Sequence, residues 1–135
     1  MAYWLMKSEP DCYSWDRLKQ DKITAWDDVR NYQARNNMMA MKRGDLAFFY
    51  HSNVGKEIVG IMEIAREHYP DPEDESGKFV LVDVKYKTPL KTPVTLSDIK
   101  AHPKLQEIKL IRQSRLSVMP VSQEEWAIIC RMGDL

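Results

Sequence analysis

The sequence has little cysteine and no excess of either charge, and these shortages exclude several classes of protein. Only two cysteines, Cys12 and Cys130, occur in 135 residues, and they lie far apart without Cys-x-x-Cys or Cys/His ligand spacing. This pattern predicts free thiols rather than a disulfide scaffold or a zinc site. Twenty basic and twenty acidic residues give a formal net charge of zero. A polybasic nucleic-acid binder that depends on overall attraction is therefore excluded, and any nucleic-acid contact must be local.

Long apolar segments are missing as well. No uncharged apolar run approaches the ~20 residues that a helix needs to cross a bilayer. Residues 1–7 contain no basic leader followed by an apolar core, so they do not resemble a secretory signal. We therefore expect no membrane contact, and a location in the cytoplasm, or in the nucleus if the source is eukaryotic.

The remaining composition is that of one globular domain. The chain is 44% hydrophobic and 30% charged, and at this length a compact chain buries roughly two-thirds of its unfolded surface without needing a metal or a disulfide. No repeat or low-complexity tract divides it. We therefore predict that residues 1–135 form a single domain, and we expect a monomer that holds no metal.

Apolar and β-branched segments predict a sheet. The predicted strands are 3–7, 46–50, 57–66, 79–87 and 116–121. Gly60 interrupts one of them, which is typical of a bulge, a barrel corner or a point where another backbone comes close. The segment 67–76 holds five carboxylates and two prolines without EF-hand spacing. It is therefore interpreted as a hydrated loop rather than a calcium site.

Capping residues predict short helices between and after these strands. Ser14 precedes a predicted helix at 15–20, and Asn31 precedes another at 32–41. Thr95 opens a helix that runs to Lys100, and 104–111 adds another turn or two. Ser122 and Glu125 form a capping box for a last helix that ends near Gly133. The order predicts an α+β fold, with an antiparallel or mixed, strongly curved sheet flanked by helices.

Catalytic motifs are absent. The sequence has no GxSxG, HExxH, P-loop or GxGxxG motif. Cys12 and His51 would form a nucleophile and base only if the fold brought them together. An enzyme that acts on a nucleotide or small molecule through this pair is one alternative. A protein interaction adaptor is another, and it predicts a large exposed apolar patch and no polar pocket.

Polar, aromatic and basic residues favour a binding site. Lys7, Ser8 and Glu9 directly follow the first predicted strand, where they would either read a base edge or complete a turn. Residues 30–43 contain four cations and no acid, and residues 104–117 contain four cations and one acid. Trp26 offers a flat ring, and stacking on such a ring is worth about 1–3 kcal/mol per base. A buried core tryptophan would give the same sequence.

Four motifs in order carry a wider resemblance. They are Tyr3–Pro10, Trp26 with Val29–Asn36, Gly44-Asp45 leading into Phe48–Ser52, and Arg112–Ser117. Together they resemble the EVE domain family over essentially the whole chain. The resemblance implies a PUA-like fold, a small curved mixed β-barrel flanked by short helices, similar to the YTH domains that read methylated adenine in RNA.

The resemblance also implies a non-catalytic module, without a cofactor, that captures a modified base from DNA or RNA. The base would be a methylated or hydroxymethylated cytosine or a methylated adenine. The implied base pocket consists of Lys7, Ser8, Glu9, Trp26, Arg30, Asn31, Tyr32, Tyr50, His51, Ser52, Ser114, Leu116 and Ser117. Trp26 would stack on the base, and Arg35, Arg112 and Arg115, together with Arg30, would contact phosphates. Positive charge is expected at the rim of the pocket.

Overall fold

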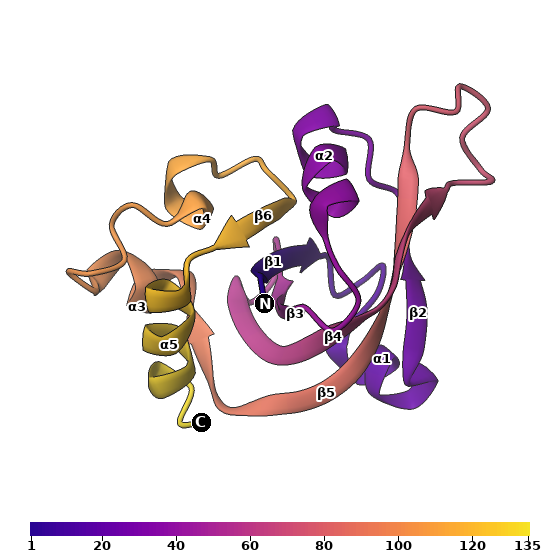
Figure 1. Cartoon of the computed structure of the whole chain (residues 1–135). Coiled ribbons are helices and arrows are strands. Elements are labelled where there is room, and N and C mark those ends of the chain that lie inside the picture. The colour runs from indigo at the N-terminus through magenta and orange to yellow at the C-terminus, as the bar shows by residue number, and fades with distance from the viewer.

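The computed structural model describes residues 1–135, which form six strands and five helices (Figure 1). The strands are β1 (Tyr3–Ser8), β2 (Ile23–Trp26), β3 (Leu46–His51), β4 (Glu57–Pro70), β5 (Val80–Thr95) and β6 (Val118–Val121). The helices are α1 (Trp15–Asp21), α2 (Tyr32–Ala40), α3 (Leu96–Ala101), α4 (Lys109–Arg112) and α5 (Gln123–Met132). No helix is long and apolar enough to span a membrane.

All six strands belong to one mixed sheet with the order β2-β5-β4-β3-β1-β6. Only β1 and β3 pair in parallel, and every other neighbouring pair is antiparallel. The long strands β4 and β5 bend together in a wide arc, with several register shifts between them (Figure 1). The sheet order ends at β2 and β6, so the curved sheet forms a barrel that is open between these edges. The α+β, PUA-like prediction is confirmed.

Aromatic stacking fixes the last helix on the sheet. Trp126 of α5 stacks on Phe48 of β3 and on Tyr3 of β1, with ring centroids 3.8 and 4.6 Å apart. Ser122 caps this helix through the predicted capping box with Glu125. Each such stacked pair stabilises the fold by about 0.5–1.5 kcal/mol beyond the burial of its apolar surface. Through Trp126, the C-terminal helix is therefore part of the core.

Gly60 marks a bulge, as its position in the sequence predicts, and the group that comes close to it is a side chain rather than another backbone. The register between β3 and β4 shifts next to it, between Ile58 and Gly60. A Cβ atom at Gly60 would lie 2.1 Å from Cζ2 of Trp15, which stands at the start of α1. Only glycine leaves room for this indole, so α1 packs directly onto the backbone of β4.

Strand lengths and one whole strand differ from the sequence predictions. β4 continues to Pro70 and β5 to Thr95, so residues 67–70 are strand rather than loop. Pairing within one long hairpin satisfies the backbone of these polar segments, and local composition does not reveal this. The four-residue strand β2 was not predicted at all. The helix predicted at 32–41 ends one residue earlier, at Ala40.

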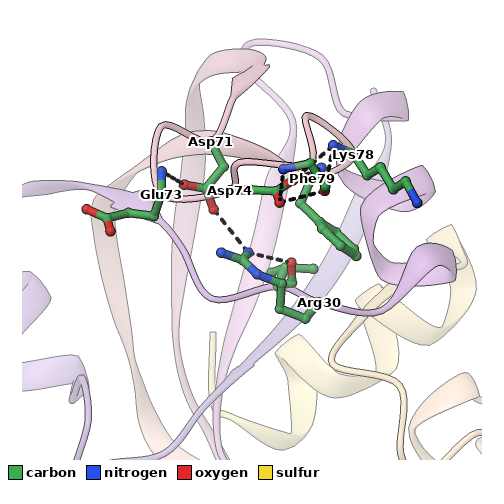
Figure 2. A network of polar contacts seen from close by, with 8 residues as sticks. Arg30, Asp71, Glu73, Asp74, Lys78 and Phe79 are labelled. Carbon is green, nitrogen blue, oxygen red and sulfur yellow. Dashed lines mark hydrogen bonds and ion pairs between the residues drawn. The ribbon is translucent and has the colours of Figure 1, made fainter.

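Two carboxylates of the acidic loop that joins β4 and β5, Asp71 and Asp74, are held by hydrogen bonds (Figure 2). Asp74 accepts hydrogen bonds from the Ser76 hydroxyl at 2.6 Å and from the backbone N–H groups of Lys78 and Phe79 at 2.9 and 2.8 Å. The bond from Ser76 leads the effects that lower the pKa of Asp74 to about 2. Asp71, which is buried, accepts from Arg30 Nη1 at 3.0 Å. No group of three or more His, Cys, Asp or Glu side chains is placed to hold a metal ion.

Candidate nucleic-acid interface

A cavity of about 610 Å³ lies on the open side of the barrel, between the end of β1 and strand β2. Five residues of the predicted base pocket line it together: Lys7, Ser8, Glu9, Trp26 and Ser117. The first three end β1 or directly follow it, Trp26 ends β2, and Ser117 directly precedes β6. The cavity therefore lies where the sheet does not close.

Strand β2 presents unpaired backbone groups at this cavity. The N–H of Tyr86 donates to the carbonyl of Lys22 at 2.9 Å, and the same register pairs Thr24 with Val84. Because backbone direction alternates along an antiparallel strand, Thr24 points its N–H and C=O toward β5, and Ala25 points its own toward the other edge. That edge has no partner strand. Ala25 lines the cavity, so a donor and an acceptor are available beside it.

Trp26 belongs both to the core and to the cavity wall. Its side chain is only 7% exposed and meets the Phe49 ring edge-to-face, with centroids 5.5 Å apart. It also lines the cavity. The core interpretation of this tryptophan is therefore correct as far as packing is concerned, and the residue is also part of the cavity wall.

Lys7 and Ser8 are partly committed to contacts within the protein. Lys7 Nζ donates to the carbonyl of Ser114 at 2.7 Å and lies 5.8 Å from the centre of the Tyr50 ring. Burial lowers the pKa of Lys7. The Ser8 hydroxyl donates to the carbonyl of Tyr13 at 2.6 Å, which is local turn chemistry. Ser8 therefore has only lone pairs left to offer a ligand.

The cavity is rich in carboxylates, so the expected positive rim is wrong for this site. The charged lining side chains are Lys7, Arg17, Glu9, Asp21, Asp27 and Asp28. Asp21 accepts from the Tyr13 hydroxyl at 2.8 Å and lies 3.8 Å from Arg17. Asp27 and Asp28 make no side-chain hydrogen bond or ion pair. The prediction failed because Arg30 and Arg35, which follow Trp26 in the sequence, contact the loop between β4 and β5 instead of the cavity.

A second, shallower concavity of about 310 Å³ holds other predicted residues. Its lining consists of Asn31, Gln33, Gln113, Ser114, Arg115 and Leu116. Gln33 Nε2 donates to Gln113 Oε1 at 2.7 Å, which joins the start of α2 to the segment after α4. This concavity has no acidic lining residue, and Arg115 is exposed without an ion-pair partner. Residues 114–117 contribute to both concavities, so the two are neighbours.

The remaining predicted pocket residues line neither concavity. Arg30 pairs with Asp71 (Figure 2), and Tyr32 stacks on Phe79 with centroids 5.3 Å apart. Tyr50, His51 and Ser52 lie at the end of β3 and just beyond it. Of these, Tyr50 is buried in the core.

Two of the predicted phosphate ligands are engaged elsewhere. Arg35 lies over the Tyr32 ring at 5.0 Å and donates to the carbonyl of Lys78 at 3.1 Å. Arg112 forms an ion pair with Glu107 at 2.9 Å. Both pairs are solvent-exposed, where such contacts are weak.

Several cavity residues were not predicted as binding residues, and most of them belong to β2 and its flanks. They are Tyr13, Arg17, Asp21, Thr24, Ala25, Asp27, Asp28 and Val29. The sequence did contain a signal for strand β2. Ile23, Thr24 and Trp26 are strand-forming residues, and the polar pairs Asp21-Lys22 and Asp27-Asp28 flank them.

Cys12 and His51 are not assembled as a nucleophile and base. The Cys12 thiol contacts Glu9 Oε2 at 3.6 Å, and the charge of Glu9 is the leading cause that raises its pKa. His51 Nε2 accepts the backbone N–H of Trp15 at 3.1 Å, and burial lowers the pKa of this histidine. The thiol is therefore protonated near neutral pH, and the ring nitrogen that would serve as a base is occupied.

The exposed large apolar side chains come from scattered elements, whereas the adaptor alternative predicts one large patch. They are Met1, Ile23, Tyr32, Met39, Val54 and Leu135, from both termini, β2, α2 and the loop between β3 and β4. Single exposed apolar residues of this kind are normal on soluble domains.

Comparison with known proteins agrees with this architecture. Mouse thymocyte nuclear protein 1 is 39% identical, and the match covers 98% of this chain and 74% of that protein. The NMR structure of Rpa0253 from Rhodopseudomonas palustris is 58% identical, with a TM-score of 0.94 over 99% of this chain and 94% of that one. A crystal structure of human THYN1 protein in complex with DNA that contains 5-methylcytosine is 34% identical, with a TM-score of 0.92 over 100% of this chain and 99% of that one.

A more distant structure, the ASCH protein from Zymomonas mobilis, shares only the fold. It is 10% identical, with a TM-score of 0.61 over 96% of this chain and 94% of that one. The family model described as the EVE domain matches residues 2–132. This chain therefore belongs to the EVE domain family.

Proposed function

We propose that this protein is a DNA-binding module that holds a modified base, 5-methylcytosine in the first instance, in the cavity between β1 and β2. The observation that carries the proposal is the position of this cavity on the open side of the barrel, in a fold shared with the human THYN1 protein that was crystallised with 5-methylcytosine-containing DNA. Its volume of about 610 Å³ lies within the range of small-molecule pockets, about 300–1,000 Å³.

The cavity offers what an everted base requires. Taking a base out of its stack costs a few kcal/mol, so the pocket must replace the lost stacking and hydrogen bonds. We assign the stacking wall to Trp26, whose contact with a base is worth about 1–3 kcal/mol. The free N–H and C=O of Ala25 and the carboxylates at the rim supply partners for the base edge.

The second concavity is the proposed place for a neighbouring phosphate. Arg115 is exposed and unpaired there, among amide and hydroxyl side chains and without a carboxylate. The acidic rim of the base cavity would repel a phosphate, so phosphate and base are held at separate places. Since Arg30 and Arg112 already pair with Asp71 and Glu107, Arg115 is the principal phosphate contact in this proposal.

Fluorescence anisotropy with labelled single-stranded and duplex oligonucleotides tests the proposal. The wild-type protein should bind DNA with one 5-methylcytosine more tightly than the same DNA with cytosine. Trp26→Ala should abolish this preference. Because Trp26 is also a core residue, Ser117→Leu provides a second variant. It fills part of the cavity at a half-buried position whose hydroxyl makes no hydrogen bond in the protein.

The matched control is Ser97→Leu, the same substitution at an exposed position on α3 away from both concavities. It should leave the preference for 5-methylcytosine unchanged. Equal binding of modified and unmodified DNA by the wild type, or an undiminished preference in folded Ser117→Leu, would contradict the proposal.

A further inference from the structure

A pocket for 5-methylcytosine in DNA faces a competitor that is present in every sequence, namely thymine. Both bases carry the same methyl group at C5. They differ at position 4, where 5-methylcytosine has an amino group and thymine has a carbonyl, and at N3, which is an acceptor in one and a donor in the other. A contact with the methyl group is the same for both bases, so it does not distinguish them. Discrimination therefore requires a group that reads position 4 or N3, and a hydrogen-bond acceptor at position 4 is such a group.

Most of the charged groups that line the cavity are acceptors. Of the two cations, Lys7 already donates to the Ser114 carbonyl at 2.7 Å, and Arg17 lies 3.8 Å from Asp21 in an exposed pair. Three carboxylates remain for a ligand. Asp27 and Asp28 have no side-chain partner, and Glu9 has only the thiol of Cys12 at 3.6 Å.

These carboxylates come from two different segments of the cavity lining. Glu9 directly follows β1, and the two aspartates directly follow β2. A flat base between the two segments would meet an acceptor at its edge. Negative charge also surrounds Cys12, which lines the cavity, because Glu9, Asp11 and Asp28 all contribute to raising the pKa of this thiol.

We infer that Glu9, Asp27 and Asp28 are specificity-determining residues, which select bases with an exocyclic amino group and reject thymine. The inference rests on the proposed function, because it assumes that the base enters this cavity. A carboxylate accepts from the N4 amino group of cytosine and repels the O4 carbonyl of thymine.

Competition anisotropy with three single-stranded oligonucleotides tests the inference. They are identical except for one central base, which is 5-methylcytosine, thymine or cytosine. The wild type should bind the 5-methylcytosine strand at least about fivefold more tightly than the thymine strand, since one good base-edge contact discriminates by about 1–3 kcal/mol.

The isosteric variants Glu9→Gln, Asp27→Asn and Asp28→Asn then locate the acceptor. An amide can rotate to present either its oxygen or its NH₂ group, so the reading carboxylate, once replaced, should accept both bases. At least one variant should lower the 5-methylcytosine-to-thymine ratio by about fivefold or more. Asp11→Asn is the matched control, because it removes the same charge beside the cavity without lining it. It should change overall affinity only.

Two results would overturn the inference while leaving the proposed function intact. One is a wild type that prefers 5-methylcytosine to cytosine but binds thymine equally well. The other is a 5-methylcytosine-to-thymine ratio that none of the three variants lowers, or that Asp11→Asn lowers as much. Loss of the preference for 5-methylcytosine over cytosine in the wild type is a different result, and it would refute the proposed function itself.

Discussion

The contact between Gly60 and Trp15 gives a sharp prediction about how α1 is attached to the sheet. A Cβ atom at Gly60 would lie 2.1, 2.4 and 2.5 Å from three atoms of the Trp15 indole. Carbon atoms pack at about 3.5–4.0 Å, so in Gly60→Ala the ring must move by more than about 1 Å. The ring is poorly placed to move, because it is 6% exposed and packs on Phe49 and Tyr86 with centroids 5.4 and 4.7 Å apart.

We expect Gly60→Ala to lower the free energy of unfolding by about 2–3 kcal/mol, the upper part of the range for an overpacked core. Without the clash, the same substitution would stabilise the protein by about 0.4–1 kcal/mol, because alanine restricts the unfolded chain. The sign of the change is therefore decisive. Urea denaturation followed by circular dichroism measures it, and a neutral or stabilising result would refute the packing argument.

A double-mutant cycle separates the clash from other causes. In a Trp15→Leu background the indole is gone, so Gly60→Ala should cost little or should stabilise the protein. The coupling between the two sites should reach about 2 kcal/mol, within the range found for residues in contact. An equal cost in both backgrounds would show that Trp15 is not the reason for glycine at this position.

Three further predictions concern the acidic hairpin loop and the second concavity. Asp71→Ala should lower the free energy of unfolding by about 1–2 kcal/mol, because it removes the partner of Arg30 and empties a buried site; urea denaturation checks this, and an unchanged midpoint would contradict it. The ordinary pKa of Asp74 is 3.8 and its folded value is about 2, so its contribution to stability is complete above about pH 4 and is lost as the pH falls through about 2. NMR spectra of the Phe79 amide should report this titration, and Asp74→Asn should abolish it. Arg115→Ala should weaken binding to modified and unmodified DNA alike and reduce the salt slope of log K by about 1, whereas a selective loss for modified DNA would place Arg115 at the base instead.

Local signals in the sequence were sufficient for much of the fold. The helix that Thr95 opens and the capping box at Ser122 form as predicted, because each cap depends on side chains only three residues apart. The bulge at Gly60 could also be predicted, since a glycine inside a strand commonly marks one. The residue that approaches it, Trp15, is distant in the sequence, and no local pattern identifies it.

The parts that were missed depend on contacts that are distant in sequence. Strand β2 has four residues, and its hydrogen bonds come from β5, more than fifty residues later. The charge around the cavity was mispredicted because neighbours in sequence do not share a surface. Arg30 faces Asp71 in the hairpin loop, whereas Asp27 and Asp28, which shortly precede it, line the cavity.

The central claim is that a modified base occupies the cavity between β1 and β2. The most direct test is an isotope-filtered NOE experiment on the complex of the protein with a short DNA strand whose single 5-methylcytosine carries a ¹³C-labelled methyl group. The account predicts that the methyl group shows NOEs to protons of residues that line this cavity, such as Trp26, Ala25 and Ser117. NOEs confined to Gln33, Arg115 or another surface would contradict it.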